Sequence, residues 1–215
     1  MGLELDDVEL RVLGCLMEKE AATPEYYPLT LNALLNACNQ KSNRDPVVAL
    51  DEDTVETALD RLRAKGLAVR ITGVDMRVPK HAHRLADVFN FGRRESAVMA
   101  ELILRGPQTG GELRSRTERM HRFDDLAAVE GTLQRLMEWV PEPLVTRLAR
   151  QPGSREARFA HLLAGRPAEP AQAEPAARRD APAPGTLADL QAAVEALQRE
   201  VDAIKRQIAE LRRDG

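Results

Sequence analysis

Four histidines and two cysteines are the side chains of this 215-residue chain best suited to metal binding or nucleophilic chemistry. His81 and His83 flank one alanine, so an extended segment would place both imidazoles on one side, as a metal site requires. No cysteine or acidic residue stands at ligand spacing from them, and we interpret them as a solvated pair. Cys38 borders a polar loop, which raises the alternative of a nucleophile. Its helical spacing from Leu31 and Leu34 instead predicts a buried structural cysteine.

Other catalytic signatures are missing from the sequence. There is no Walker loop, dinucleotide fingerprint or HExxH motif. The carboxylate pairs Asp6-Asp7 and Asp124-Asp125 open helical segments, where capping and the helix dipole explain them. We therefore predict that the protein is not an enzyme, with no catalytic residue, cofactor or metal.

Basic and amide side chains gather in places where they could contact phosphates or an acidic partner. A solvated charge pattern is the alternative, because the net charge is −3. For residues 39–44 a structural turn is a second alternative, since Asn43 and Asp45 favour turns and Pro46 follows. The candidate nucleic-acid or partner contacts are Asn39, Gln40, Lys41, Asn43, Arg44, Arg114, Arg116, Arg147, Arg150, Arg155 and Arg158.

The elements that must position these residues follow from hydrophobic spacing. The first half predicts helices over 6–19, over 31–38 with Thr30 as N-cap, and from Asp51 to a stop at Gly66. A short strand is expected at 47–50, a hairpin from alternation at 67–71 and 76–78, and a helix over 81–90.

The second half repeats this plan. Residues 55–62 and 129–136 both read V-E-x-x-L-x-R-L. Helical segments at 97–104 and 111–117 precede the second copy, and a hairpin at 144–148 and 157–163, with a turn at 151–154, follows it. Similar elements around both copies indicate an internal duplication.

The third helix of each half is acidic. In the first half Asp51, Glu52, Asp53, Glu56 and Asp60 outnumber the bases that follow them. Helices that read the major groove present donors to bases and phosphates. The charge pattern therefore argues against simple groove reading by these helices.

The C-terminal part changes character. An Ala/Pro-rich stretch over 166–185 is expected to be a linker, because it has almost no large apolar residue. Steps of three and four then predict a coiled-coil helix over 186–213 that pairs two chains, with an amphipathic helix packed on the body as the alternative. Its seam is Leu187, Leu190, Val194, Leu197, Val201, Ile204, Ile208 and Leu211.

These elements predict a mainly α protein with small β-hairpins, of the α+β class. Two tandem winged-helix domains are expected at 1–91 and 92–165, followed by the linker and the coiled coil. No apolar run approaches the ~20 residues of a membrane-spanning helix. The N-terminus lacks a signal-peptide pattern, and the cysteines form no CxxC pair, so a cytoplasmic location without membrane contact is expected.

Three stretches carry a family resemblance: "LGCLMEKEAATPEYYPLTLNALLNACNQKSNRDPV", "ILRGPQTGGELRSRTERMHRF" and "LVTRLARQPGSREARFAHLL". They closely resemble the YceH-like family of uncharacterised bacterial proteins over residues 3–165. The resemblance implies two tandem winged-helix domains and brings no activity, ligand or catalytic residue.

Two functions from different classes follow as expectations. The first is a dimeric DNA-binding or transcription-related regulator, in which basic residues contact phosphates. The second is a protein–protein interaction module or scaffold, built on the acidic helices, that does not bind DNA directly. The fold alone does not separate them.

Overall fold

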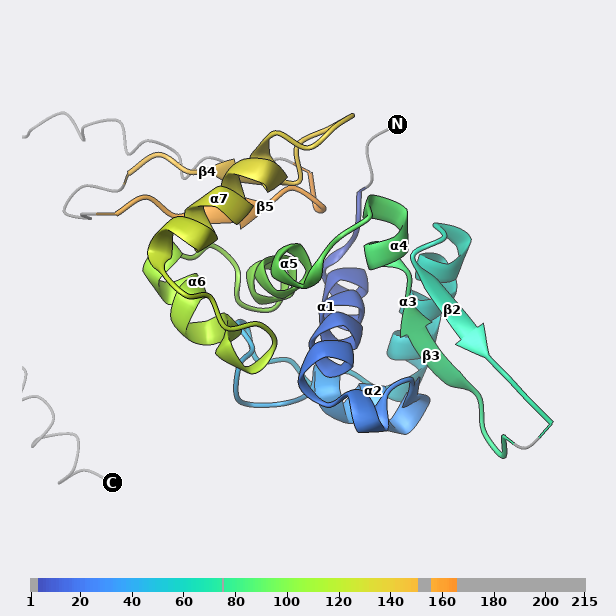
Figure 1. The fold of residues 1–215 in the computed structure, drawn as a ribbon. Helices are drawn as coiled ribbons and strands as arrows, with labels where there is room; N and C mark the ends of the chain where they lie inside the picture. The colour runs from blue at the N-terminus through green and yellow to red at the C-terminus, as the bar shows by residue number, and fades with distance from the viewer. Residues whose placement is uncertain (1–3, 75, 151–155, 166–215) are drawn as a thin grey trace, which may run out of the picture. The chain divides into compact units, whose positions relative to one another are not determined.

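The computed structural model describes residues 4–74, 76–150 and 156–165. These residues form an α+β protein, in which small antiparallel sheets lie at the edges of a group of α-helices (Figure 1). The elements of the first half are α1 (Asp7–Ala22), η1 (Pro24–Tyr26), β1 (Leu29–Thr30), α2 (Leu31–Cys38), α3 (Glu52–Ala64), β2 (Ala68–Ile71), β3 (Lys80–His83) and α4 (Leu85–Phe89). The second half contains α5 (Arg93–Arg105), α6 (Gly110–Arg116), η2 (Thr117–Arg119), α7 (Leu126–Met137), β4 (Val145–Arg147) and β5 (Phe159–His161).

The predicted caps of α2 and α3 are confirmed, whereas α1 extends to Ala22 and α5 begins at Arg93, beyond the predicted 6–19 and 97–104. Thr30 caps α2 by accepting a hydrogen bond from the Ala33 amide, and Asp51 caps α3 through the Thr54 amide. Gly66, with φ of +74°, follows the end of α3 in a conformation that favours glycine.

The two halves repeat the same hydrogen bonds around their third helices. The Leu67 amide donates to the Leu62 carbonyl at 2.8 Å, and the Leu144 amide donates to the Leu136 carbonyl at 2.9 Å. Leu62 and Leu136 are the last residues of the two V-E-x-x-L-x-R-L copies. The repeated pattern in the sequence is therefore also repeated in backbone geometry.

The sheets repeat as well. In the first half the strand order is β1-β3-β2, with all pairs antiparallel. In the second half β4 pairs with β5, and an isolated bridge between Gln108 and Phe159 lies where β1 pairs with β3. The strands β3 and β5 continue into the similar sequences A-H-R-L-A (82–86) and A-H-L-L-A (160–164). His83 and His161 are thus equivalent positions of the repeat.

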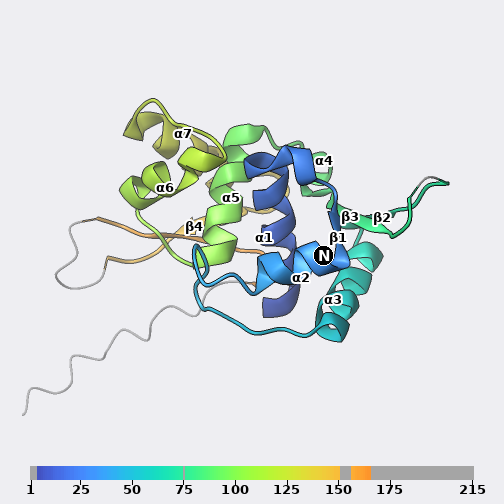
Figure 2. The ribbon, with the colours of Figure 1, turned by 90° about the horizontal axis from the view of Figure 1, so that it is seen from below.

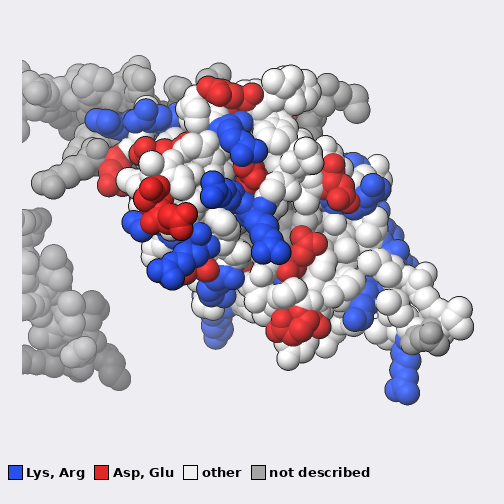
Figure 3. All heavy atoms as spheres, viewed as in Figure 1, with Lys and Arg blue, Asp and Glu red and all other residues white. Residues whose placement is uncertain are grey.

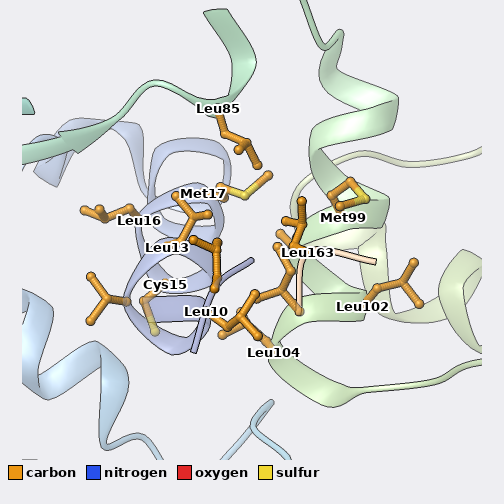
Figure 4. Packing of buried hydrophobic residues seen from close by; sticks show 14 of the residues in the cluster. Leu10, Leu13, Cys15, Leu16, Met17, Leu85, Met99, Leu102, Leu104 and Leu163 are labelled. Atoms are coloured by element: carbon orange, nitrogen blue, oxygen red, sulfur yellow. The ribbon is translucent and has the colours of Figure 1, made fainter. Parts of the chain in front are cut away.

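One hydrophobic core joins the two halves. Helices α1 and α5 lie side by side (Figures 1 and 2). Residues Glu9–Glu18 of α1 are all buried, because α1 packs on α2 and α3 as well as on α5. Figure 4 shows Leu10 and Leu13 of α1 facing Leu104 of α5. The described residues consequently belong to one compact unit rather than to two separate cores.

A glycine permits this close approach. A Cβ atom at Gly14 would lie 2.8 Å from Cγ2 of Ile103 and 2.9 Å from Cδ2 of Leu104. Contacts this short require the neighbouring atoms to move, and overpacking of a core typically costs about 1–3 kcal/mol. Gly14 therefore sets the distance between α1 and α5.

Three local predictions were wrong. The short extra strand is β1 at Leu29–Thr30, because this segment pairs with β3, whereas residues 47–50 form no strand. Met76 and Val78 lie in the exposed β2–β3 connection, which projects from the helices (Figure 2). The second strand of the hairpin is β3, and the helix expected over 81–90 is limited to α4.

The predicted boundary between residues 91 and 92 falls between α4 and α5. The predicted linker over 166–185 and the coiled-coil helix over 186–213 lie outside the described residues. No helix among the described residues is both long and apolar enough to cross a membrane.

Candidate functional site

The polar stretch 39–46 borders the contact between the two halves, where the Asp45 amide donates to the Leu104 carbonyl of α5 at 2.9 Å. Arg44 is buried, and its Nη2 atom lies 2.6 Å from Oε2 of Glu18 in α1. The same guanidinium donates to the Ala37 carbonyl through Nε at 3.1 Å and Nη2 at 3.0 Å. This placement removes Arg44 from the candidate contact surface, because the guanidinium is used inside the protein.

The amide side chains of this stretch also have internal partners. Asn39 forms two 2.8 Å hydrogen bonds with the backbone of Leu50, and Gln40 accepts from Arg44 at 3.2 Å. Asn43 accepts a hydrogen bond from Arg105 of α5. Lys41 is exposed. The stretch thus connects the two halves, and Lys41 is the member that faces solvent as a contact residue would.

Glu18 is the centre of this polar contact. Its Oε1 atom also lies 2.9 Å from Nη2 of Arg119 in η2. Arginines from both halves therefore pair with one buried carboxylate. Burial alone would raise the pKa of Glu18, but the hydrogen bond and charge of Arg44 hold this pKa below its ordinary value. The carboxylate is therefore ionised at neutral pH, and its pairing with arginines offsets the cost of burying its charge.

Two of the candidate arginines of the second half support local structure. Arg116 donates to Oε1 of Gln108 at 2.8 Å and pairs with Glu112 at 3.3 Å. Arg158 donates to the Pro107 carbonyl at 3.0 Å and lies 3.8 Å from Glu112. These two arginines are partly committed to the β5–α6 contact.

Two adjoining surface hollows lie beside α6 and α7. One, of about 370 Å³, is lined by Arg114 and Arg122. The other, of about 280 Å³, is lined by Arg147 and Arg150. Gly111 and Leu126 line both hollows, so the two form one continuous surface. We call this surface, defined by these four arginines together with Gly110, Gly111 and Leu126, the arginine surface.

Three glutamates, Glu118, Glu130 and Glu156, also line the hollows, and the four arginines of the arginine surface are exposed beside them. Arg114 is exposed and donates to the Asp124 carbonyl at 2.8 Å, while Arg122 is 3.9 Å from Glu118, a long exposed pair. Arg147 and Arg150 are exposed, and no ion pair joins them to another residue of the described ranges. Figure 3 shows Lys and Arg side chains gathered over α6 and α7, with acidic side chains between them. Arg155, also a candidate contact, lies outside the described residues.

The third helix of the first half, α3, presents exposed acids, and its bases are paired. Glu52, Asp53 and Glu56 of α3 are exposed, as the sequence predicts. The bases of this helix are paired: Arg61 lies 2.8 Å from Asp6, and Arg63 pairs with Asp60. The acidic face of α3 is therefore repulsive to phosphates, and the two halves of the repeat have diverged in charge.

The interpretation of His81 and His83 as a solvated pair was wrong, because both side chains are buried in β3. His83 accepts from the Leu85 amide through Nδ1 at 3.2 Å, so Nε2 carries the proton and donates to Glu20 at 2.9 Å. Burial and the nearby Arg63 keep the pKa of His81 low. The His83 imidazole thus links β3 to α1, whereas Nδ1 of His81 is buried without a hydrogen-bond partner among the described residues.

Cys15 and Cys38 are fully buried free thiols, and the structural role predicted for Cys38 is confirmed. Among the described residues, no cluster of three His, Cys, Asp or Glu side chains could hold a metal ion.

Sequence reasoning missed Arg122 and Leu126 as members of a site. Leu126 is 41% exposed at the start of α7, and a Cβ at Gly110 would approach its Cδ1 atom to 3.2 Å. The signal available in the sequence was the Gly110-Gly111 pair at the start of a helix, where missing side chains leave the adjoining hollow open.

The described residues thus define an α+β protein with a duplicated plan of helices and a hairpin, one shared core and one arginine-rich surface. Residues 5–154 match the family described as "Protein of unknown function, DUF480", and the chain belongs to this family. It is 65% identical over 165 residues to a UPF0502 protein of Solibacter usitatus, covering 77% of this chain and 78% of that protein. A UPF0502 protein of Geobacter sulfurreducens is 62% identical over 167 residues, covering 78% and 75%.

Proposed function

We propose that this protein is a non-enzymatic tandem winged-helix protein that binds DNA through the arginine surface of its second half. The observation that carries the proposal is the pair of adjoining hollows with four arginines on one exposed face. Guanidinium groups suit phosphate oxygens because they donate in a planar fork. These guanidinium groups support the second half as the part of the proposed regulator that would bind DNA.

The order of elements supports the winged-helix assignment. Helix, short strand, helix, helix and two-stranded hairpin follow one another in the first half, and the bridge at Gln108 takes the place of the short strand in the second. In a winged helix the second and third helices and the hairpin share one DNA-facing side. In the second half, α6, α7 and β4 all contribute to the arginine surface.

The coiled-coil helix predicted over 186–213 adds a dimer to the proposal. Its seam would pair two chains, so that a dimer presents two copies of the arginine surface. Two weak phosphate-binding surfaces held together bind more tightly than either alone. This dimer would be cytoplasmic, where DNA is accessible.

A charge-reversal experiment tests the location. We expect the double variant Arg147→Glu and Arg150→Glu to bind a mixed-sequence duplex at least about tenfold more weakly at low salt, because phosphates would face carboxylates. The readout is fluorescence anisotropy of a labelled duplex, with circular dichroism of each variant as a check on folding.

A matched control separates this surface from total charge. Arg93 and Arg94 are exposed at the start of α5 and line neither hollow. Reversing both to Glu makes the same change in charge, and the helix dipole favours acids at that position. Equal weakening by both double variants, or a parent protein that binds no duplex at low salt, would contradict the proposal.

The acidic face of α3 favours a second candidate function, a protein–protein interaction module. Glu52, Asp53 and Glu56 form an exposed acidic face that suits a basic protein segment. This alternative requires no DNA contact. It is supported if the protein binds no duplex and an α3 variant with Glu52→Lys and Glu56→Lys loses a purified basic partner.

A further inference from the structure

The side-chain hydrogen-bond donors of α7 bear on whether the arginine surface would contact the bases of DNA. This inference rests on the proposed function. In a winged helix, the third helix supplies the side chains that reach base edges. Reading a base requires free donors or acceptors at the groove-facing positions of that helix. In α7 the side-chain donors are Thr132, Gln134 and Arg135.

Each of these three side chains has a contact inside the protein. Thr132 is buried and donates to the Ala128 carbonyl at 2.9 Å. Gln134 donates to Oε1 of Glu138, and Arg135 lies 3.1 Å from Oε1 of Glu95, a buried carboxylate of α5. Releasing Arg135 would leave that carboxylate buried without its cation, which is costly. A base contact by Gln134 or Arg135 would therefore compete with a contact inside the protein, and Thr132 is too buried to reach a base.

The remaining exposed face of α7 is short and mostly uncharged. It carries Leu126, Ala127 and Gly131, with Glu130 as the acidic exception. A Cβ at Gly131 would meet no atom within 4 Å, so the helix surface there is open. Such a face lets the backbone of a duplex come close, and the arginines on both sides of α7 supply the attraction.

The aromatic residues at the arginine surface indicate whether it suits double-stranded or single-stranded DNA. Proteins that bind single strands stack bases on exposed aromatic rings. At the two hollows the aromatic residues are Phe123, which is buried, and Phe159, which lies in β5 and is partly buried. No exposed aromatic residue lines either hollow, so the surface lacks a stacking platform.

We infer that the arginine surface binds double-stranded DNA through its phosphates, without reading the base sequence. Arg114, Arg122, Arg147 and Arg150 hold the backbone, and α7 lies against the duplex without hydrogen bonds to bases. The ligand class is thus any B-form duplex of sufficient length.

The test compares duplexes of equal length whose sequences are scrambled, AT-rich or GC-rich, together with the matching single strands, using the full-length protein. We expect the duplex affinities to agree within about threefold, since one mismatched contact in a sequence reader typically costs more than that. Gln134→Ala should leave every affinity unchanged. Arg147→Gln should weaken all duplexes alike and reduce the steepness of the log–log salt dependence by about one per chain.

The outcomes are distinguishable. A single well-read base gives a preference of about tenfold or more. If one duplex binds that much more tightly than the others, or if Gln134→Ala removes a preference, sequence independence is overturned. The proposed function stays intact in either case. Tighter binding of single strands would overturn the duplex inference in the same way. Failure of every nucleic acid to bind at low salt would overturn the proposed function, and this inference with it.

Discussion

Replacing Arg44 with Met is expected to lower the free energy of unfolding by about 3 kcal/mol, because removal of one partner leaves a buried charge unpaired. Arg44 has a fully buried side chain, and its guanidinium binds Glu18 and the Ala37 carbonyl. Glu18 keeps its contact with Arg119 at 2.9 Å, which holds the loss near the lower end of the range for broken buried pairs. Urea denaturation at equal protein concentrations measures the difference.

Lys41 provides the matched control. It lies three residues earlier in the same polar stretch but is exposed, so Lys41→Met should change stability by less than about 0.5 kcal/mol. Adding Glu18→Gln to Arg44→Met should recover part of the loss, because the unpaired charge is then removed. A loss below about 1 kcal/mol in Arg44→Met would mean that the buried pair of Arg44 and Glu18 does not stabilise the fold as described.

The second large effect is a pH dependence of stability caused by His161. Part of this residue meets solvent, but its Nδ1 atom is buried and has no hydrogen-bond partner. Burial lowers the pKa of His161 to about 4, from an ordinary value near 6.5. Between these values the unfolded chain binds a proton that the folded protein does not, so stability falls as pH falls through this window. The full loss is about 3 kcal/mol.

His161→Phe should remove this part of the pH dependence, so that the stabilities of parent and variant diverge between about pH 6.5 and 4. His121→Phe is the control, because it makes the same exchange at an imidazole that has no buried nitrogen without a hydrogen-bond partner. Carboxylates such as Glu18, whose pKa is lowered, lose their contribution only below about pH 4.5, at the lower end of this window. Parallel curves for the parent and His161→Phe would show that folding does not lower the pKa of His161.

The repeat shows one difference between the surroundings of His161 and those of His83. Glu9 and Glu95 begin α1 and α5 in the same way, each accepting a hydrogen bond from the N-cap amide. Counting from these residues, Gly106 occupies the position of Glu20, which pairs with His83 in the first half. The second half therefore has the histidine without its carboxylate.

Sequence reasoning located the helices because their apolar residues repeat at helical spacing over long segments. Both third helices and their duplication follow from V-E-x-x-L-x-R-L. It failed for β1, since two residues are too short for alternation to show, and for β3, since Lys80–His83 has few apolar residues although most of it is buried. Burial there comes from tertiary packing, which local pattern does not contain.

The candidate site was only partly predictable for a related reason. Lys41 and Arg44 have the same charge and similar neighbours in the sequence, yet one is exposed and the other buried. What distinguishes them is Glu18, which is remote in the sequence and adjacent in space. Similarly, Arg122 and Arg147 line adjoining hollows because α6 and β4 fold onto α7.

The claim that DNA meets the second half is tested most directly by mapping amide chemical shifts of the isotope-labelled full-length protein as a duplex is added. The account predicts that shifts concentrate at Gly110, Gly111, Leu126 and Arg147, which belong to the arginine surface. Exposed amides of α3, such as that of Glu56, should not move, because this helix repels phosphates. Shifts that concentrate on α3 while the arginine surface stays unchanged would contradict the account.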